Sequence, residues 1–183
     1  MFRRDIRDGF YMQLLEERHA PAIFAASDRD REHLRQWLPW VDKTTCVDHT
    51  LNFVKSSLQS FANKQGITAG IWSGDEYAGT IGTYNTNWMD RKAALGYWIA
   101  SKFQGRGIVT DACRLLIGHV FHELDLNRVE IYCAPGNVKS CAIPKRLGFQ
   151  LEGVLREAQL LAGKPIDLNL YAMLAREWKT AAR

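Results

Sequence analysis

Residues 96–112, GYWIASKFQGRGIVTDA, decide the fold of this chain. An apolar run typical of a strand leads into the turn QGRG at 104–107, and a helix pattern follows at once. The start of a helix carries unpaired backbone N–H groups and the positive end of the helix dipole, and glycines let the backbone approach a phosphate. The stretch therefore predicts a pyrophosphate cradle, with a simple turn as the alternative.

Two common nucleotide-binding motifs do not fit this turn. It holds only two glycines, no βαβ repeat surrounds it, and no Gly-Lys-Ser/Thr follows, so it is neither a Rossmann motif nor a P-loop. Gly96 lies inside the expected strand, where glycine costs stability and often marks a bulge or the close approach of another backbone or a ligand.

The segments around this unit alternate between strand and helix patterns. Apolar runs separated by polar turns predict antiparallel strands, and the helix after QGRG has an apolar residue at every fourth position. The expected elements are strands at 67–72, 77–84 and 93–100, a helix from 108 to about 126, a strand at 128–133, a short helix at 137–147, and strands at 147–155 and 167–174.

The N-terminal part predicts one strand and several helical segments. Residues 10–15 alternate with a period of two, and a mixed segment up to Arg31 predicts a helix. Apolar residues at helical intervals between His33 and Lys64 predict a helical region that Pro39 interrupts. This order is α+β, with helices flanking a mixed sheet, and 183 residues suit a single domain, 1–183.

Composition and charge narrow the function classes. No apolar stretch approaches the roughly 20 residues that span a bilayer, and the N-terminus lacks a signal-peptide core, so a cytoplasmic protein without membrane contact is expected. The net charge of +4 is dispersed along the chain. This distribution suits an anionic cofactor or acidic partner and disfavours nucleic-acid binding, which would need a clustered basic surface.

The cysteines and histidines do not predict a metal site. His119 and His122 could share a helix face but lack a third ligand, so no metal is expected. The cysteines show neither zinc-ligand spacing nor a disulfide framework, and free buried thiols are expected at Cys46, Cys113, Cys133 and Cys141.

Several of these segments together resemble the RimJ/RimL branch of the GNAT acetyltransferases, most clearly over residues 66–174. The resemblance is carried by GYWIASKFQGRGIVTDA, NRVEIYC, the N-x-x-S run at 137–140, RLGF at 146–149, LEGVLREA and DLNLYAML. It implies the GNAT fold, a mixed and mostly antiparallel central sheet flanked by helices with splayed central strands. It also implies an acetyl-CoA-dependent N-acetyltransferase that uses no metal.

The resemblance implies which residues hold acetyl-CoA. Backbone amides of the cradle would bind the pyrophosphate, although Val109 departs from the family's small residue and should alter packing more than phosphate recognition. The pantetheine arm would pair with the splayed strand, and an N–H near Ile99 or Ala100 would bind the thioester oxygen. The cofactor-binding residues expected in this way are Trp98, Ile99, Ala100, Gln104, Gly105, Arg106, Gly107, Ile108, Val109, Thr110, Asn137 and Ser140.

Two residues of the N-x-x-S run carry both structural and chemical interpretations. Asn137 is a good helix N-cap, and the resemblance adds a contact with pantetheine. The resemblance also places the Ser140 hydroxyl near the cofactor sulfur, where it could help to protonate the leaving thiolate. Lys102, Arg106, Lys139 and Arg146 flank the cradle and could pair with the 3′-phosphate of coenzyme A or form a solvated basic face.

Pro144 and the missing glutamates set this chain apart from its family. Many GNAT enzymes have a tyrosine acid where this chain has Pro144, and proline cannot donate to the carbonyl of Ser140. We therefore expect this carbonyl to be free to bind a water or the acceptor amine. Glutamates of RimL-like relatives match the neutral Ala94 and Gln159, which leaves Glu130 as the candidate base, with Asp167 and Glu152 as alternatives.

The acceptor is the least constrained part of the prediction. Trp37, Trp40 and Tyr84 are expected to line its site, although core packing is the ordinary role of such residues. The resemblance points to a protein N-terminal α-amine, as on a ribosomal protein, attacking the thioester directly. A polyamine or amino sugar is the rival acceptor, and a non-catalytic acyl-CoA-binding module is the rival function. Relatives commonly self-associate, so a homodimer or a higher homo-oligomer is expected.

Overall fold

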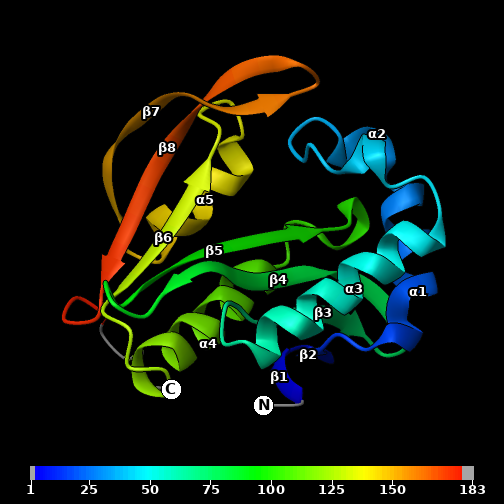
Figure 1. Ribbon diagram of the computed structural model, residues 1–183, viewed down its shortest axis with the longest axis horizontal. Coiled ribbons are helices and arrows are strands. Elements are labelled where there is room, and N and C mark those ends of the chain that lie inside the picture. The colour runs from blue at the N-terminus through cyan, green and yellow to red at the C-terminus, as the bar shows by residue number, and fades with distance from the viewer. Residues whose placement is uncertain (1–2, 179–183) are drawn as a thin grey trace.

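In a computed structural model, which describes residues 3–178, all eight strands form one sheet (Figure 1). The strands follow the order β1-β2-β3-β4-β5-β6-β8-β7, and every neighbouring pair is antiparallel except β5 and β6. Their bounds are β1 Arg3–Arg7, β2 Phe10–Leu14, β3 Thr68–Ser73, β4 Glu76–Asn87, β5 Lys92–Ile99, β6 Arg128–Cys133, β7 Gln150–Leu161 and β8 Lys164–Leu174.

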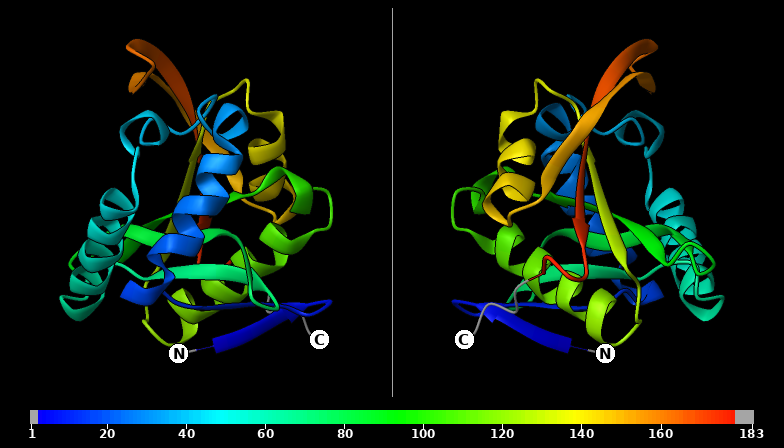
Figure 2. Two further views of the ribbon diagram at one scale, coloured as in Figure 1. Left: turned by 90° about the vertical axis from the view of Figure 1, so that its right-hand side faces the viewer. Right: turned by 90° about the vertical axis from the view of Figure 1, so that its left-hand side faces the viewer.

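Helices cover both faces of this sheet (Figure 2). One face is packed by α4 and α5, and the opposite face by α1 and α3, which contact each other. The helices are α1 Ala20–Arg29, α2 Arg31–Leu34, α3 Val47–Ala62, α4 Ile108–His122 and α5 Val138–Arg146, with short 3-10 turns at Glu17–His19, Val41–Lys43 and Ser101–Phe103. Among the described residues, no helix is long and apolar enough to cross a membrane.

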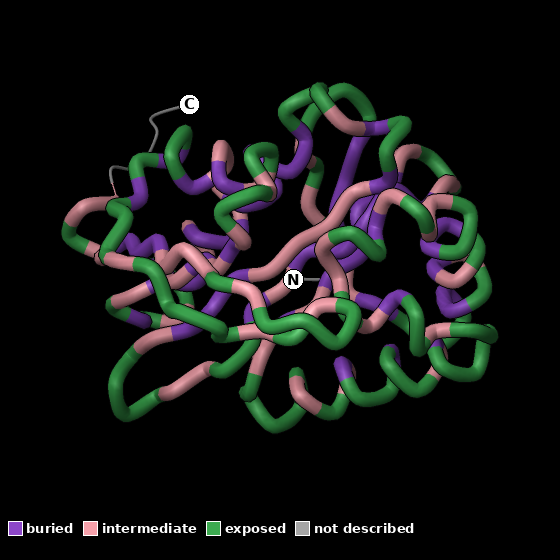
Figure 3. Tube along the Cα trace, turned by 90° about the horizontal axis from the view of Figure 1, so that it is seen from above, coloured by how far each residue is buried: buried purple, intermediate pink, exposed green. Residues whose placement is uncertain are grey.

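The larger core lies between the sheet and α4. Apolar residues of α4 recur on its buried face and meet alternate residues of β5 and β6, because a helix period of 3.6 and a strand period of 2 each turn one side inward. Residues buried along β6 are Val129, Ile131 and Cys133, whereas the residues between them point to the opposite face. Buried residues are concentrated in β3 and the first half of β4, whereas β7 is exposed along most of its length. Figure 3 colours the trace by the burial of each residue.

The parallel pair β5 and β6 separates soon after it begins. Only Lys92, Ala93 and Ala94 pair with residues of β6, although β5 continues to Ile99. Beyond Ala94 the two strands diverge, and the sheet opens into a V (Figure 1). The expected α+β architecture with splayed central strands is therefore confirmed.

Four elements differ from the sequence prediction. The strand β1 was not expected, because RRDIR is mostly charged, and as an edge strand it stays largely exposed. The helix expected to reach residue 126 ends at His122, because Asp125 adopts a φ of 53°. Leu126 is apolar and buried although it lies beyond the helix, and for this reason the apolar pattern of the sequence extended past the true end of α4. The last two strands are longer than predicted. Their additional residues form an exposed hairpin, and its polar residues do not show the apolar pattern from which the strands were predicted.

The first helical region also divides differently. Helix α1 ends at Arg29, and α2 is a separate short helix. The region predicted as helical from His33 to Lys64 contains an irregular segment up to Cys46 before α3 begins. Pro39 lies within this irregular segment, as its lack of a backbone N–H would require.

Two glycine substitutions should separate close strand packing from simple helix propensity. A Cβ on Gly79 of β4 would lie 2.2 Å from the carbonyl oxygen of Trp98, whereas a Cβ on Gly118 of α4 would meet nothing within 4 Å. Gly79→Ala should lower the free energy of unfolding by about 1–3 kcal/mol through this overlap. Gly118→Ala should raise it by about 0.5–1 kcal/mol, since alanine favours a helix interior. Urea unfolding measures both, and equal signs would contradict the packing described here.

Candidate functional site

A cavity of about 970 Å³ opens where β5 and β6 diverge. Its walls come from the end of β5, the turn after it, the first turn of α4, α5 and the segment around α2. Most of the residues predicted to bind the cofactor lie in these walls: Trp98, Ile99, Gln104, Gly105, Arg106, Gly107, Ile108, Val109, Thr110, Asn137 and Ser140. Tertiary structure thus gathers two sequence segments, 98–110 and 137–140, around one space.

The QGRG turn exposes the N-terminus of α4 to this cavity. Gly105 and Gly107 have φ values of 76° and 77°, a left-handed conformation that glycine adopts without strain. The first hydrogen bond of the helix runs from the Asp111 N–H to the Gly107 carbonyl. The four N–H groups from Gly107 to Thr110 precede it, and no side chain within residues 3–178 caps this end. Free N–H groups and the helix dipole here favour an anion.

Val109 has a second role in this turn. It is buried in the larger core beside Ile108, and both residues also line the cavity. The side chain at this position therefore contributes to core packing.

Basic side chains surround the anion-binding end. The cavity is lined by five arginine and lysine side chains and one carboxylate, that of Asp111. Arg7 of β1 bonds one oxygen of Asp111 at 2.9 Å, and Arg114 bonds the other at 2.6 Å. Sequence reasoning missed Arg7 because β1 was not predicted. It missed Arg114 because the residue follows the glycine motif by two helical turns.

The four cations expected near the cradle divide into two groups. Arg106, Lys139 and Arg146 line the cavity, and Arg146 also donates to the Thr110 hydroxyl at 2.9 Å. Lys102 does not line it and instead pairs with Glu76.

The backbone of β5 offers hydrogen bonds to the cavity at alternate residues. The Ala100 N–H donates to the Ala78 carbonyl at 2.8 Å, so this group points toward β4. Because strand residues alternate, the N–H of Ile99 points the other way, toward the gap that β6 leaves. The expectation for Ala100 is wrong, since its N–H is occupied and the residue does not line the cavity. The N–H of Ile99 therefore remains as the candidate donor to the thioester oxygen.

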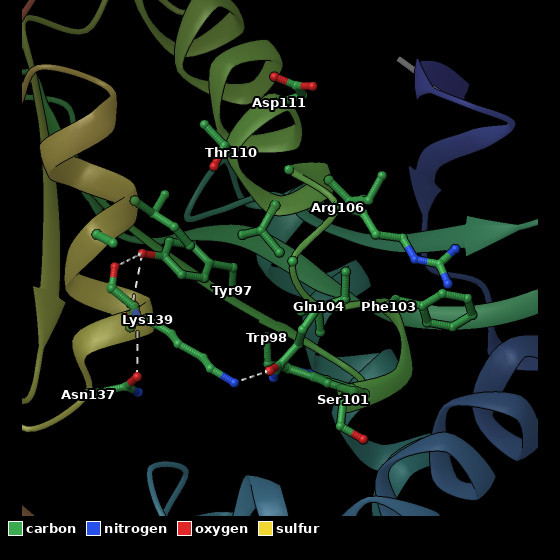
Figure 4. Close-up of a pocket in the computed structure, with 18 of the residues that line it drawn as sticks. Tyr97, Trp98, Ser101, Phe103, Gln104, Arg106, Thr110, Asp111, Asn137 and Lys139 are labelled. Carbon is green, nitrogen blue, oxygen red and sulfur yellow. Dashed lines mark hydrogen bonds between the residues drawn. The ribbon is translucent and has the colours of Figure 1, made fainter.

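Asn137 and Ser140 lie together at the start of α5. The Asn137 side chain accepts a hydrogen bond from the Ser140 N–H at 3.1 Å, so Asn137 is a helix N-cap as its residue type suggested. Asn137 also lines the cavity, and its side chain faces the space between α5 and the QGRG turn (Figure 4).

The carbonyl of Ser140 is not free, contrary to the expectation from Pro144. The Tyr97 hydroxyl, which points from β5 to the first turn of α5, donates to this carbonyl at 3.1 Å (Figure 4). The Ser140 hydroxyl in turn lies 3.4 Å from the Tyr97 hydroxyl. Tyr97 lies on β5, far from α5 in the sequence, so the sequence of α5 alone could not indicate this hydrogen bond. Its hydroxyl donates to the carbonyl that the N–H of a non-proline residue at position 144 would otherwise have bonded.

A polar bridge crosses the mouth of the cavity. The Gln104 amide oxygen accepts from Lys139 at 2.8 Å, and its amide nitrogen lies 2.6 Å from a ring nitrogen of His33 (Figure 4 shows the first contact). The turn before α4 is thereby connected to both α5 and α2. Asp30 adds a second connection, because its carboxylate accepts from the Ser101 N–H and hydroxyl at 2.6 Å each.

The aromatic residues predicted to bind the acceptor separate into two places. Trp37 lines the cavity beside α2. Trp40 does not line it but packs against Trp98, with ring centroids 6.1 Å apart. Tyr84 lies away from both, in a smaller groove beside α3. The three residues thus do not form one wall.

Tyr84 shares a row of the sheet with Glu130. Tyr84 pairs with Ala94, and Ala94 pairs with Glu130 at the last position before β5 and β6 diverge. The small Ala94 therefore lies between a phenol and a carboxylate at the apex of the V. Gly96 follows on the same face, where an added Cβ would lie 3.2 Å from the Tyr84 ring. A bulge or the close approach of a backbone or ligand was expected at Gly96, whereas the group that lies close to it is the Tyr84 side chain.

Glu130 is held by two neighbours and does not line the large cavity. Arg128 contacts one carboxylate oxygen at 2.6 Å, and the Tyr132 hydroxyl donates to the other at 2.6 Å. Desolvation raises the pKa of Glu130, but the hydrogen bonds from Tyr132 and Arg128 outweigh it, and the pKa is lowered overall. Arg128 also binds Glu152 of β7, so the three charges form one network.

The cysteines differ in part from the expectation of free buried thiols. Cys113, Cys133 and Cys141 are free and buried, but Cys46 is exposed. The Cys133 and Cys141 sulfurs lie 3.0 Å apart beneath the start of α5, a proximity that their sequence separation did not indicate. No group of three or more potential metal ligands occurs within residues 3–178.

Comparisons with known proteins agree with this geometry. Residues 10–150 match the acetyltransferase (GNAT) domain family. A putative ribosomal N-acetyltransferase, YdaF of Bacillus subtilis, is 36% identical over 180 residues, 98% of each chain. The structure of RimL, a ribosomal L7/L12 alpha-N-protein acetyltransferase in complex with coenzyme A, has a TM-score of 0.88 at 27% identity and covers 92% of this chain and 96% of its own.

A structural neighbour whose name describes a different role has the same TM-score. The microcin C7 self immunity acetyltransferase MccE, in complex with acetyl-CoA and AMP, has a TM-score of 0.88 at 26% identity. The match covers 92% of this chain and 94% of that chain. The two neighbours thus share the fold, while one name refers to a ribosomal protein and the other to self immunity to a microcin.

The N-cap at Asn137 generates a stability prediction. Asn137→Ala removes the acceptor for the Ser140 N–H and should lower the free energy of unfolding by about 1 kcal/mol. Asn137→Ser keeps a capping oxygen and serves as the matched control, with a smaller loss. Thermal or urea unfolding of the two variants measures the difference, and equal losses would show that the cap contributes nothing.

Proposed function

The chain belongs to the GNAT family of N-acetyltransferases, and from this premise we propose that it transfers the acetyl group of acetyl-CoA to the N-terminal α-amine of a protein. The observation that carries the proposal is the continuous site formed by the uncapped N-terminus of α4 and the unpaired edge of β5. The ribosomal names of the relatives make a ribosomal protein the proposed class of acceptor.

The donor side fits the chemistry of coenzyme A at each of its parts. A pyrophosphate needs several N–H donors and positive charge, which Gly107–Thr110 and the basic rim provide. Pantetheine carries amides and can pair with an unpaired strand edge, which β5 offers beyond Ala94. In this assignment the basic rim, with Arg106, Lys139 and Arg146, also faces the 3′-phosphate.

Catalysis in this proposal depends mainly on positioning. Bound acetyl-CoA would supply an activated thioester carbonyl carbon for attack by a neutral amine. The Ile99 N–H donates toward the gap and would stabilise the negative charge that develops on the carbonyl oxygen. The Ser140 hydroxyl would donate toward the departing sulfur. Holding the two reactants together can supply roughly 7 kcal/mol or more of the barrier reduction.

The acceptor is assigned to the face of the sheet that carries Trp98, Tyr84 and Glu130. On this face the small residues Ala94 and Gly96 lie beside the apex of the V, and the Tyr84 ring packs close to Gly96. Trp40 packs against Trp98 in a tilted arrangement, and both Trp98 and Trp37 line the cofactor cavity. A polar apex and an aromatic rim suit a peptide N-terminus, whose amine must be desolvated before attack.

A small amine is the second candidate acceptor. MccE, whose name describes self immunity to a microcin, shares the fold over most of this chain. Its structure contains AMP beside acetyl-CoA, so this fold can accommodate a small polar molecule in addition to the donor. The experiment below distinguishes this candidate from a protein acceptor.

The acceptor class can be tested directly with purified protein and acetyl-CoA. Peptides with free N-terminal serine or alanine should release coenzyme A thiol and gain the mass of one acetyl group. The same peptides with a blocked N-terminus but a free lysine should not react, because the α-amine is the proposed nucleophile. Polyamines and amino sugars form the competing panel. Turnover with these alone would contradict the protein acceptor, and the absence of turnover with every amine would contradict the proposed function.

The proposed base, Glu130, has a matched control in Glu152, because both carboxylates bind Arg128. Glu130 is ionised at neutral pH but is a weak base, so Glu130→Gln should lower kcat/KM by about 100-fold, the low end of general-base catalysis. Glu152→Gln should change it only slightly. For either protein kcat/KM should rise with pH toward the amine pKa of about 8. Equal losses in both variants would assign Glu130 to the Arg128 network alone.

A further inference from the structure

Pro144 leaves one backbone acceptor of α5 without its helical partner. In a regular helix the N–H of residue 144 would donate to the Ser140 carbonyl, but proline has no N–H and its ring crowds the carbonyl four residues earlier. The Tyr97 hydroxyl donates to this carbonyl at 3.1 Å. A side chain of β5 thereby replaces a backbone hydrogen bond of α5, across the cavity in which both residues lie.

We propose that Tyr97 is a positioning residue for acetyl transfer, which holds the Ser140 carbonyl and so fixes the Ser140 hydroxyl beside the gap between β5 and β6. This inference rests on the proposed function, because Ser140 is the group assigned to the departing sulfur. Tyr97 acts through Ser140 and is not assigned contact with the reacting atoms. Its partner in this arrangement is Pro144, which makes the carbonyl available.

The first turn of α5 is held from two sides. Asn137 accepts from the Ser140 N–H at 3.1 Å, and Tyr97 donates to the Ser140 carbonyl. Both backbone polar groups of Ser140 are therefore satisfied by side chains, one from the start of its own helix and one from β5. The backbone of this residue is anchored where α5 meets the cavity, and this anchoring fixes the position from which its side chain extends.

The hydroxyl of Ser140 keeps the freedom to donate elsewhere. Its oxygen lies 3.4 Å from the Tyr97 hydroxyl, longer than the usual 2.7–2.8 Å of such bonds, and the contact is weak. A sulfur carrying negative charge is a better acceptor than a neutral phenol, so the Ser140 proton would turn to it. The Tyr97 hydroxyl stays protonated, because burial raises its pKa well above the ordinary value, and it continues to donate to the carbonyl.

A stability cycle tests the link between Tyr97 and Pro144 in the protein without ligand. Tyr97→Phe leaves the Ser140 carbonyl without a donor and should lower the melting midpoint by about 2–4 °C. In the Pro144→Ala background the new N–H can take the carbonyl, so the same substitution should have little effect. Tyr11→Phe is the matched control, since it removes a 2.9 Å tyrosine-to-carbonyl bond on β2 and should cost the same in both backgrounds. Equal costs of Tyr97→Phe in both backgrounds would overturn the link.

A spectroscopic titration tests the effect on the sulfur without any amine acceptor. Coenzyme A is bound to the wild-type protein and to the Tyr97→Phe and Tyr11→Phe variants, and thiolate absorbance is followed against pH, with acetyl-CoA as the thiol-free blank. Loss of a positioned donor should reduce the thiolate fraction at a given pH about three- to tenfold in Tyr97→Phe. Tyr11→Phe should match the wild type. In a Ser140→Ala background, Tyr97→Phe should have no further effect.

Each outcome decides a different part of the inference. Binding of coenzyme A with an unchanged thiolate fraction in Tyr97→Phe would overturn the positioning role while leaving the proposed function intact. A further decrease in the Ser140→Ala background would also overturn it, because Tyr97 would then act by another route. Failure of the wild-type protein to bind coenzyme A would overturn the proposed function and this inference together.

Discussion

The loss of pairing between β5 and β6 after Ala94 is the constraint on which the rest of the site depends. A parallel pair held along its full length would have left β5 without free N–H groups on the side of β6. Divergence of the strands instead leaves a cavity that is lined by the end of β5 on one side and by α5 on the other. The unpaired edge is tolerable because it lies inside the molecule, covered by α4, α5 and the segment around α2, and not at an open edge of the sheet.

The two faces of β5 contribute to different parts of the site. Residues at odd positions, Tyr97 among them, face α4 and α5, and their N–H groups point into the gap. Residues at even positions, including Ala94 and Trp98, face the side of α1 and α3, where the acceptor is assigned. The period of two along one strand thus assigns donor and acceptor to opposite faces, with the gap between them as the place where they meet.

Predictions from the sequence were correct where a feature depends only on residues that are neighbours in the chain. The turn QGRG indicated a glycine-rich turn and the start of a helix, and the structure has both, with α4 beginning directly after Gly107. Asn137 indicated a helix cap and is one. The predictions failed where the partner is distant in the chain. Arg7 lies in an unpredicted edge strand, and the donor to the Ser140 carbonyl is Tyr97, forty-three residues away.

The sequence by itself determined the architecture, because hydrophobic periods of 2 and 3.6 and the glycine turn are properties of neighbouring residues. It also determined which backbone groups lack a local partner, at the N-terminus of α4 and at Ser140 before Pro144. Only the tertiary structure decided how those groups are satisfied. The Ala100 N–H donates to the Ala78 carbonyl, and the Ser140 carbonyl accepts from Tyr97. Strand register and helix packing set which distant groups come within hydrogen-bonding distance.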